Sequence, residues 1–253
     1  MGDEAAPAFY ARQGGAIGDW WTVLHPPYTL WHLSYVVLGA AVAPHRDWTA
    51  LGFTVLAFFL AVGLAAHALD ELHGRPLRTG IRATTLWAVA LVALAGATAI
   101  GVVGALFRDG PQWALLVTVP AGAFLVVAYN LELFGGRFHT DHVFAWAWGG
   151  FPVVVGLLAQ APAWSATLVL ATAGATLAAL GTSYAQRFLS TPARRLRRGI
   201  TEVSGTLVTT TGVGIPLQRQ TLLKPLEQAL RALSWAVPAV AATLLLAGSA
   251  QGR

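Results

Sequence analysis

Long apolar runs separated by short polar segments dominate the chain. A helix needs roughly 20 apolar residues to cross a bilayer. Because a helix satisfies its own backbone hydrogen bonds, it is the default structure within a membrane. The pattern therefore predicts an all-α integral membrane protein with about seven transmembrane helices, at residues 28–44, 50–70, 82–107, 112–130, 142–160, 164–188 and 229–248.

The segments between these runs predict a few smaller elements. Residues 16–24 precede a Pro-Pro pair and are expected to form a short surface helix. Residues 203–217 are β-branched and glycine-rich, which favours a small β-hairpin or a lid over the mouth of the bundle. Residues 221–231 are expected to form a short amphipathic helix. The expected organisation is one transmembrane domain over 1–253, with an N-terminal interfacial segment at 1–27 and a cytoplasmic loop at 189–228.

Composition agrees with a membrane protein, since 56% of the residues are hydrophobic, 11% are charged and the mean hydropathy is +0.61. The many small residues favour close contact between helices. The chain has no cysteine, which excludes disulfides and thiolate ligands. Its net charge of +5 indicates membrane topology rather than nucleic-acid binding.

The basic residues also predict an orientation. Of the sixteen arginines and lysines, only Arg46, Arg108 and Arg253 fall on the side of the membrane opposite the N-terminus. Cytoplasmic segments carry an excess of basic residues. We therefore expect a bacterial cytoplasmic membrane protein whose N-terminus is cytoplasmic and whose C-terminus is outside.

Two short polar stretches at the ends of apolar runs are the candidate chemistry. The first runs from His67 to His73, and the second comprises Glu132 and the stretch from His139 to His142. Ionisable groups at the edge of the hydrocarbon are costly, so they need a partner or a function. The expected topology brings both stretches to the cytoplasmic face, near His32 in the first span.

Histidine and carboxylate at helical spacing suit a transition metal. Residues three or four apart share a helix face, and imidazole with carboxylate binds zinc, iron or manganese. The sequence thus predicts a divalent transition-metal site, with iron favoured, whose ligands are His32, His67, Glu71, Glu132, His139 and His142. Catalytic or proton-carrying roles are expected for Asp70, His73 and Asp141, and substrate contacts for Tyr184 and Arg75.

Simpler interpretations of these residues stay open. Asp70 and Glu71 could pair with Arg75 or Arg78, and Glu132 with Arg137. A basic run at Arg194, Arg195, Arg197 and Arg198 could meet anionic lipid headgroups. The same run could instead bind a phosphate-bearing substrate.

Three segments resemble the UbiA superfamily of intramembrane prenyltransferases. Residues 26–45, PPYTLWHLSYVVLGAAVAPH, resemble its first span, and residues 145–160, AWAWGGFPVVVGLLAQ, resemble its fifth. The stretch from Gly74 to Gly80, GRPLRTG, resembles the Arg-Pro-Leu sequence after the first Asp-rich motif of that family. The likeness covers roughly residues 26–160.

This resemblance implies a UbiA-like bundle with a central cavity near the cytoplasmic face. In the family, two Asp-rich motifs hold Mg²⁺ and a prenyl diphosphate. Asp70 and Glu71 stand where the first motif is expected, but His67–Glu71 replaces its usual Asn-Asp-x-x-Asp pattern. The second motif is absent, because residues 181–192 contain no Asp or Glu.

The leading prediction is an intramembrane metal-dependent enzyme that acts on a lipid or isoprenoid by oxidative or hydrolytic chemistry. One alternative is a Mg²⁺-dependent prenyltransferase or terpene-cyclase-like enzyme that uses a prenyl diphosphate. Another is a non-enzymatic proton-coupled transporter or a haem-binding membrane protein. In each case the expected partners are the membrane and a small lipid-like molecule, and nucleic acid is not expected.

Overall fold

A computed structural model describes residues 6–12, 14–106, 112–161 and 163–250. In it, helices account for most of these residues, and a single hairpin of two short strands accounts for the rest of the regular structure. In chain order the elements are α1 (Gly15–Leu24), α2 (Pro26–Val42), α3 (Trp48–Phe58), η2 (Phe59–Ala66), α4 (His67–Leu72), α5 (Ala83–Leu106), α6 (Trp113–Asn130), α7 (Asp141–Ala145), η3 (Trp146–Gly150), α8 (Phe151–Leu158), α9 (Ala166–Arg198), β1 (Thr206–Val208), β2 (Gly214–Pro216) and α10 (Arg219–Ala250).

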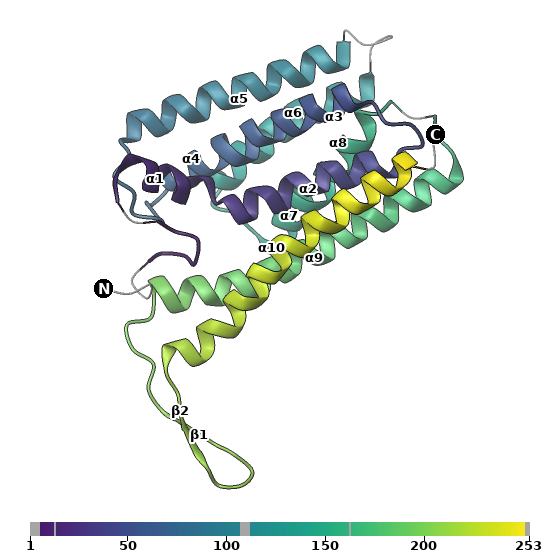
Figure 1. The fold of residues 1–253 in the computed structure, drawn as a ribbon. Coiled ribbons are helices and arrows are strands. Elements are labelled where there is room, and N and C mark those ends of the chain that lie inside the picture. The colour runs from purple at the N-terminus through teal and green to yellow at the C-terminus, as the bar shows by residue number, and fades with distance from the viewer. Residues whose placement is uncertain (1–5, 13, 107–111, 162, 251–253) are drawn as a thin grey trace.

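The helices form a bundle with α5 along one edge and α9 and α10 along the other (Figure 1). Within the described residues, six helical stretches are long and apolar enough to span a membrane: Trp48–Leu72, Ala83–Leu106, Trp113–Asn130, Asp141–Leu158, Ala166–Arg198 and Arg219–Gly248. The seventh expected span is α2, which has 17 residues and packs between α8 and α10. The expected all-α bundle is confirmed.

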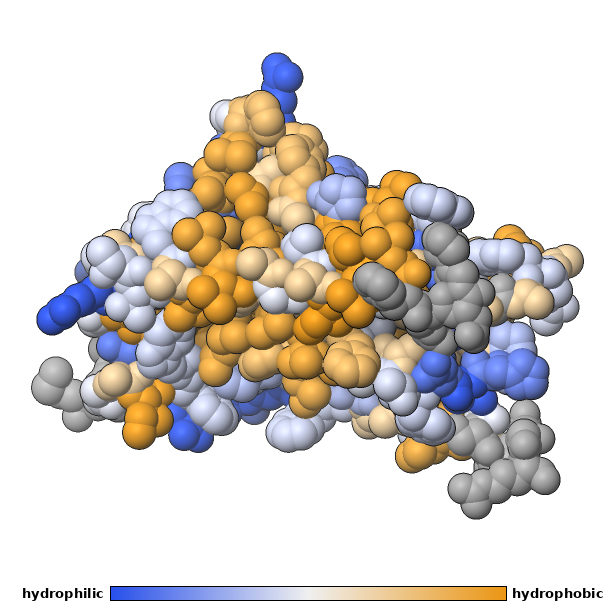
Figure 2. Space-filling model, turned by 90° about the horizontal axis from the view of Figure 1, so that it is seen from above, coloured by the Kyte–Doolittle hydropathy of each residue, from blue (hydrophilic) through white to orange (hydrophobic). Residues whose placement is uncertain are grey.

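The outer surface of the bundle is apolar. The side chains of Leu91, Val92 and Leu170 are 61%, 74% and 73% exposed. Figure 2 shows hydrophobic side chains gathered over the middle of one face, with hydrophilic residues towards its margins. A soluble protein rarely exposes so much contiguous apolar surface. The chain is therefore an integral membrane protein.

Glycine allows α2 and α8 to approach very closely. A Cβ atom added to Gly39 would lie 2.0 Å from the carbonyl oxygen of Val153, and one added to Gly156 would lie 2.2 Å from that of Val36. Small residues permit such backbone contact between membrane helices. The contact fixes α2 at the centre of the bundle, where it carries His32.

One end of the bundle collects the polar loops. Helix α1 and the β1–β2 hairpin lie at this end, and the last turns of α10 lie at the opposite end (Figure 1). We call it the polar end, and it also carries the loops at residues 73–82 and 131–140. Arg108 and Arg253, two of the arginines expected at the other end, lie outside the described residues.

The loop expected at 189–228 is shorter in the structure. Helix α9 continues through Pro192 to Arg198, and α10 begins at Arg219, so the expected amphipathic helix at 221–231 is its first part. Ala193 and Leu196 are buried beyond the proline, and this packing offsets the hydrogen bond that proline removes. The expected hairpin is present, with Leu207 paired to Ile215.

Two membrane helices contain π-helical turns near their middle. The η2 turn joins α3 to α4, and the η3 turn joins α7 to α8. A π turn inserts an extra residue into an α-helix and is frequent at functional sites. Both turns face the interior of the bundle, since Val62 and Gly63 in η2 and Ala147 and Trp148 in η3 are buried.

Candidate functional site

A cavity of about 440 Å³ lies inside the polar end. Helices α2, α4, α6 and α9 supply most of its wall, and the N-terminal segment supplies Tyr10. We call it the polar cavity. Its ionisable side chains are Tyr10, His25, Tyr28, His32, His67, Asp70, Tyr129, His139, Arg187, Arg194, Arg195 and Arg198.

Three histidines in the polar cavity are held by backbone carbonyl groups. The Nδ1 atom of His32 lies 2.9 Å from the oxygen of Trp148, that of His67 lies 3.2 Å from Gly63, and that of His139 lies 3.1 Å from Tyr129. A carbonyl oxygen only accepts, so each Nδ1 carries the proton. In the neutral ring Nε2 is then an acceptor, ready to bind a proton or a ligand.

The π turns supply two of these three carbonyl groups. Gly63 belongs to η2, and Trp148 belongs to η3. The i→i+5 pattern of a π turn disturbs the regular backbone ladder. The irregular backbone is thus where the structure anchors His32 and His67.

A fourth histidine, His25, joins α1 to α2 in a left-handed conformation with φ of 46°. Its ring packs edge-on against that of His67, with 4.3 Å between the ring centroids. Burial lowers the pKa of His25 well below its usual value near 6.5, and the neighbouring His67 and Arg198 lower it further. His25 therefore stays neutral at physiological pH.

Residues 6–12 are held against α1 and α9 at the polar end, and Tyr10 lines the polar cavity. The Nε atom of Arg198 donates to the carbonyl oxygen of Pro7 at 3.0 Å, and Arg197 donates to that of Ala6 at 3.1 Å. The indole nitrogen of Trp21 donates to the carbonyl oxygen of Tyr10 at 3.1 Å. Burial raises the pKa of the Tyr10 phenol well above its usual range, so its hydroxyl remains protonated.

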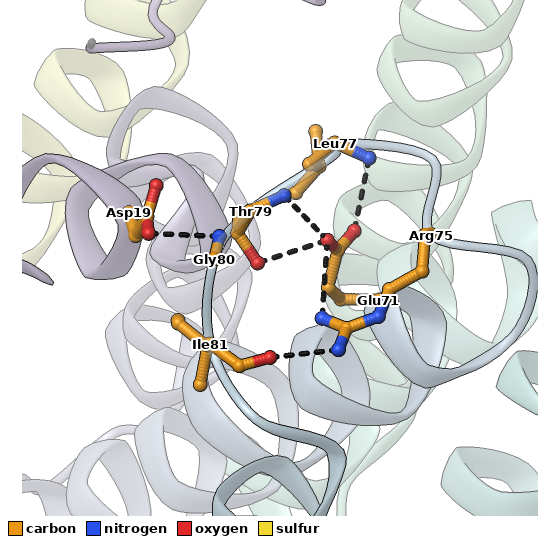
Figure 3. A network of polar contacts seen from close by, with 7 residues as sticks. All are labelled: Asp19, Glu71, Arg75, Leu77, Thr79, Gly80 and Ile81. Atoms are coloured by element: carbon orange, nitrogen blue, oxygen red, sulfur yellow. Dashed lines mark hydrogen bonds and ion pairs between the residues drawn. The ribbon is translucent and has the colours of Figure 1, made fainter. Parts of the chain in front are cut away.

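Glu71 anchors a loop instead of facing the polar cavity (Figure 3). Its carboxylate is fully buried and accepts hydrogen bonds from the backbone of Leu77 and Thr79 and from the Thr79 hydroxyl, each at 2.9 Å. Arg75 lies 3.7 Å from the same carboxylate and donates to the oxygen of Ile81 at 2.7 Å. Buried backbone N–H groups require such acceptors. The expected metal role of Glu71 and substrate role of Arg75 do not fit these contacts.

The second polar stretch divides between the cavity and the outer surface. His139 lines the polar cavity, but Glu132 is 43% exposed and lies 3.7 Å from both His73 and His139. His142 is exposed and bonds to the hydroxyl of Tyr184.

Asp141 forms an ion pair with Arg187, at 2.6 Å. Arg187 lines the polar cavity, whereas Asp141, His142 and Tyr184 do not.

The expected site residues therefore separate into two groups. Among the described residues, no three His, Asp or Glu side chains are placed to hold one metal ion. His32, His67, Asp70 and His139 come together around the polar cavity. Those that the structure keeps apart from the cavity are Glu71, His73, Arg75, Glu132, Asp141, His142 and Tyr184.

Several residues of the polar cavity were not singled out from the sequence, or were given little weight. Arg187 and Arg194 are seven residues apart, and Arg194 and Arg198 are four apart. These spacings place the three side chains on one face of a helix. That spacing would have identified them if α9 had been extended past Pro192. His25 and Tyr10 lie outside the apolar runs and carry no comparable signal.

A second cavity, of about 580 Å³, extends from the polar cavity towards the other end of the bundle. We call it the apolar cavity. It shares Val62 and Trp148 with the polar cavity, so the two adjoin at the π turns. Its wall comes mainly from α3, η2, α5, α6 and α8 and includes Phe53, Ala57, Ala61, Leu94, Ala97, Gly101, Leu115, Val119, Ala123, Phe151 and Val155.

The fold and the paired cavities define an integral membrane protein with two adjoining cavities, one lined by polar and charged side chains and the other mainly by apolar ones. No protein-family model and no curated protein matches the sequence.

Among solved structures, the chain is similar to a UbiA homolog from Archaeoglobus fulgidus bound to Cd²⁺, with 13% identity and a TM-score of 0.49 over 90% of this chain and 84% of that one.

Proposed function

We propose that the protein is an intramembrane enzyme whose substrate is a long-chain lipid with a polar head, an isoprenoid being the favoured class. The supporting observation is that the polar and apolar cavities share Val62 and Trp148. An amphiphile whose chain fills the apolar cavity would put its head among the arginines and histidines. Binding sites of this kind combine an apolar wall with a few fixed polar groups.

In this arrangement the bond between head and chain lies near the two π turns, beside His32 and His67. The proposed reaction breaks this bond, which is the step that prenyl transfer and hydrolysis have in common. The bonding electrons leave with the head. Neutral imidazoles and Asp70 are the groups that would move protons there. Transfer of the chain to an acceptor is the form that the UbiA resemblance implies.

The experiment blocks the junction between the cavities. Val62→Phe places a large side chain at the shared wall, and Val92→Phe adds the same side chain at a position 74% exposed on the outer surface. We expect Val62→Phe to weaken binding of a radiolabelled prenyl phosphate by tenfold or more, an energy change of about 1.4 kcal/mol. Val92→Phe should leave binding unchanged. Equal affinity in both variants, with both folded, would contradict the proposal.

A transition metal in the polar cavity is a second candidate, favoured by one observation. His32, His67 and His139 each donate Nδ1–H to a carbonyl group, which is how metal-binding histidines are commonly oriented. Since no three such side chains are placed together among the described residues, at most two of them would bind one iron, zinc or manganese ion, and water or substrate would supply the other ligands.

Elemental analysis of protein purified without chelators tests this candidate. A metal held by histidine should be present in stoichiometric amount and lost from a His67→Ala/His139→Ala double variant. His142→Ala is the matched control, because His142 does not line the polar cavity. Metal content near zero in the native protein would exclude this candidate.

We also propose that the polar end faces the cytoplasm, on the basis of its basic residues. The chain has no cysteine, so single cysteines report the orientation without background. Thr210 lies in the hairpin at the polar end, and Ala163 lies at the other end. The two reporters are the single variants Thr210→Cys and Ala163→Cys. An impermeant maleimide should label Ala163→Cys in intact cells and Thr210→Cys only after lysis. The reverse pattern would contradict this orientation.

A further inference from the structure

The positive charge of the polar cavity exceeds its negative charge. Four arginines line it, and Asp70 is the carboxylate among its lining residues. Arg187 is neutralised by its ion pair with Asp141. No described carboxylate forms an ion pair with any of the other three, Arg194, Arg195 and Arg198. The cavity therefore favours an anion.

Helix α9 aligns two of these three arginines. Arg194 and Arg198 are one helical turn apart, and Arg195 lies beside them on the cavity wall. Each guanidinium offers five N–H donors in a planar fork, which matches the oxygens of a phosphate group. Arg198 uses its Nε–H on Pro7, which orients the rest of the group.

The polar cavity offers few ligands for a magnesium-bound diphosphate. Mg²⁺ is usually bound through one or two carboxylates together with substrate phosphates, and the polar cavity offers the smaller number, Asp70 alone, against three arginines without a carboxylate partner. Glu71 is the neighbouring carboxylate, but its oxygens are taken by Leu77, Thr79 and Arg75. Among the described residues, Asp70 belongs to no group of three or more His, Asp or Glu side chains that could hold a metal ion.

We infer that the polar cavity binds the phosphate or diphosphate head of its lipid directly through Arg194, Arg195 and Arg198, with no divalent cation between head and protein. The inference rests on the proposed function and specifies the head of the substrate. After Asp70 is counted, these arginines retain about two positive charges, close to the charge of a phosphate monoester at neutral pH. Arginine thus replaces the cation that a carboxylate-rich site would need.

The test is calorimetric titration of the full-length protein in detergent with farnesyl monophosphate, a farnesyl thiodiphosphate and farnesol, each in EDTA and in Mg²⁺. We expect both phosphorylated lipids to bind with dissociation constants that agree within twofold in EDTA and Mg²⁺. Farnesol should bind at least tenfold more weakly. The tighter of the two phosphorylated lipids identifies the head as phosphate or diphosphate.

Arginine variants supply the second arm. Arg194→Ala/Arg198→Ala should weaken binding in EDTA by tenfold or more, and Arg194→Lys/Arg198→Lys should recover part of the loss, because lysine keeps the charge without the fork. Arg82→Ala/Arg137→Ala removes two exposed arginines at the same end and should leave binding unchanged. Thermal unfolding of each variant establishes that it is folded.

The outcomes separate the inference from the proposed function. Binding that requires Mg²⁺, disappears in Asp70→Asn and survives in the arginine variants overturns the inference but leaves the lipid substrate in place. If farnesol binds as tightly as the two phosphorylated lipids, the inference is likewise overturned and the lipid substrate is kept. Failure of all three lipids to bind in either condition overturns the proposed function itself.

Discussion

The polar and apolar cavities adjoin, but their walls are built differently. In the polar cavity His32, His67 and His139 are fixed by hydrogen bonds to the backbone. The wall of the apolar cavity is formed largely by alanine, glycine and aliphatic side chains without such bonds. Fixed polar groups discriminate strongly between ligands, whereas an apolar wall distinguishes one methylene from another by only about 1–3 kcal/mol. The head of the substrate should therefore be recognised more strictly than its chain.

The largest effect is expected from removing the buried anchor of the polar end. Glu71→Ala leaves two backbone N–H groups of the 73–81 loop without an acceptor and leaves Arg75 without its carboxylate. We expect the free energy of unfolding to fall by about 3 kcal/mol. Chemical denaturation in mild detergent measures it.

The matched control is Glu132→Ala, which removes an equally charged side chain from the same end. Glu132 is 43% exposed and its nearest basic atoms are 3.7 Å away. Its loss should cost less than about 1 kcal/mol. If the free energy of unfolding falls by a similar amount in both variants, burial does not make Glu71 more important for stability than Glu132.

A smaller apolar cavity should weaken the binding of lipids with long chains. Ala123→Phe fills part of it, whereas Ala121→Phe changes a neighbouring position that does not line it. We expect Ala123→Phe to weaken binding of a 20-carbon prenyl phosphate by about tenfold, since each methylene kept from burial costs about 0.8 kcal/mol. Binding of a 10-carbon homologue, and of either lipid to Ala121→Phe, should be unchanged. Equal loss for both chain lengths would contradict a chain site.

His25 should make the polar end sensitive to acid. Its pKa is lowered by burial, so the unfolded chain binds a proton near pH 6.5 that the folded chain excludes. The corresponding stability is fully present above pH 6.5 and decreases as the pH falls towards the folded pKa, by at most about 1.4 kcal/mol per pH unit. His25→Asn keeps a residue that tolerates the left-handed backbone. Its unfolding curves should depend less on pH between 6.5 and 5, and an unchanged slope would refute this role.

The smallest effect is expected at the outer pair of the second stretch. His142→Gln removes the hydrogen bond to Tyr184 on the surface of α9. The cost should be about 0.5–1 kcal/mol of stability, with lipid affinity unchanged within twofold. A marked loss of lipid affinity would extend the site beyond the polar cavity.

The bundle was predictable because long apolar runs leave a chain few alternatives in a membrane. The hairpin was predictable from its β-branched, glycine-rich sequence, and the collection of His32, His67, Asp70 and His139 at one end followed from the alternation of spans. These features depend on local pattern and on the direction of each helix.

Side-chain direction was not predictable in the same way. Asp70 and Glu71 are adjacent, yet one lines the polar cavity and the other is buried under a loop, because the backbone of Leu77 and Thr79 needed an acceptor. The π turns add a residue that shifts the helix faces beyond Phe59 and Trp146. The periodicity of apolar residues in the sequence does not predict such a shift of the helix faces.

The packing of α2 between α8 and α10 has a consequence for how the protein is made. Helix α2 is made well before its partners α8 and α10, which come much later in the chain. At a synthesis rate of about 5–20 residues per second, α2 waits roughly ten seconds or more for α10. For most of that interval His32 lacks the arginines of α9, which form part of the wall of the polar cavity. The wall of the polar cavity is therefore incomplete until α9 has been made, so a chain that stopped before Arg198 would insert into the membrane without these arginines.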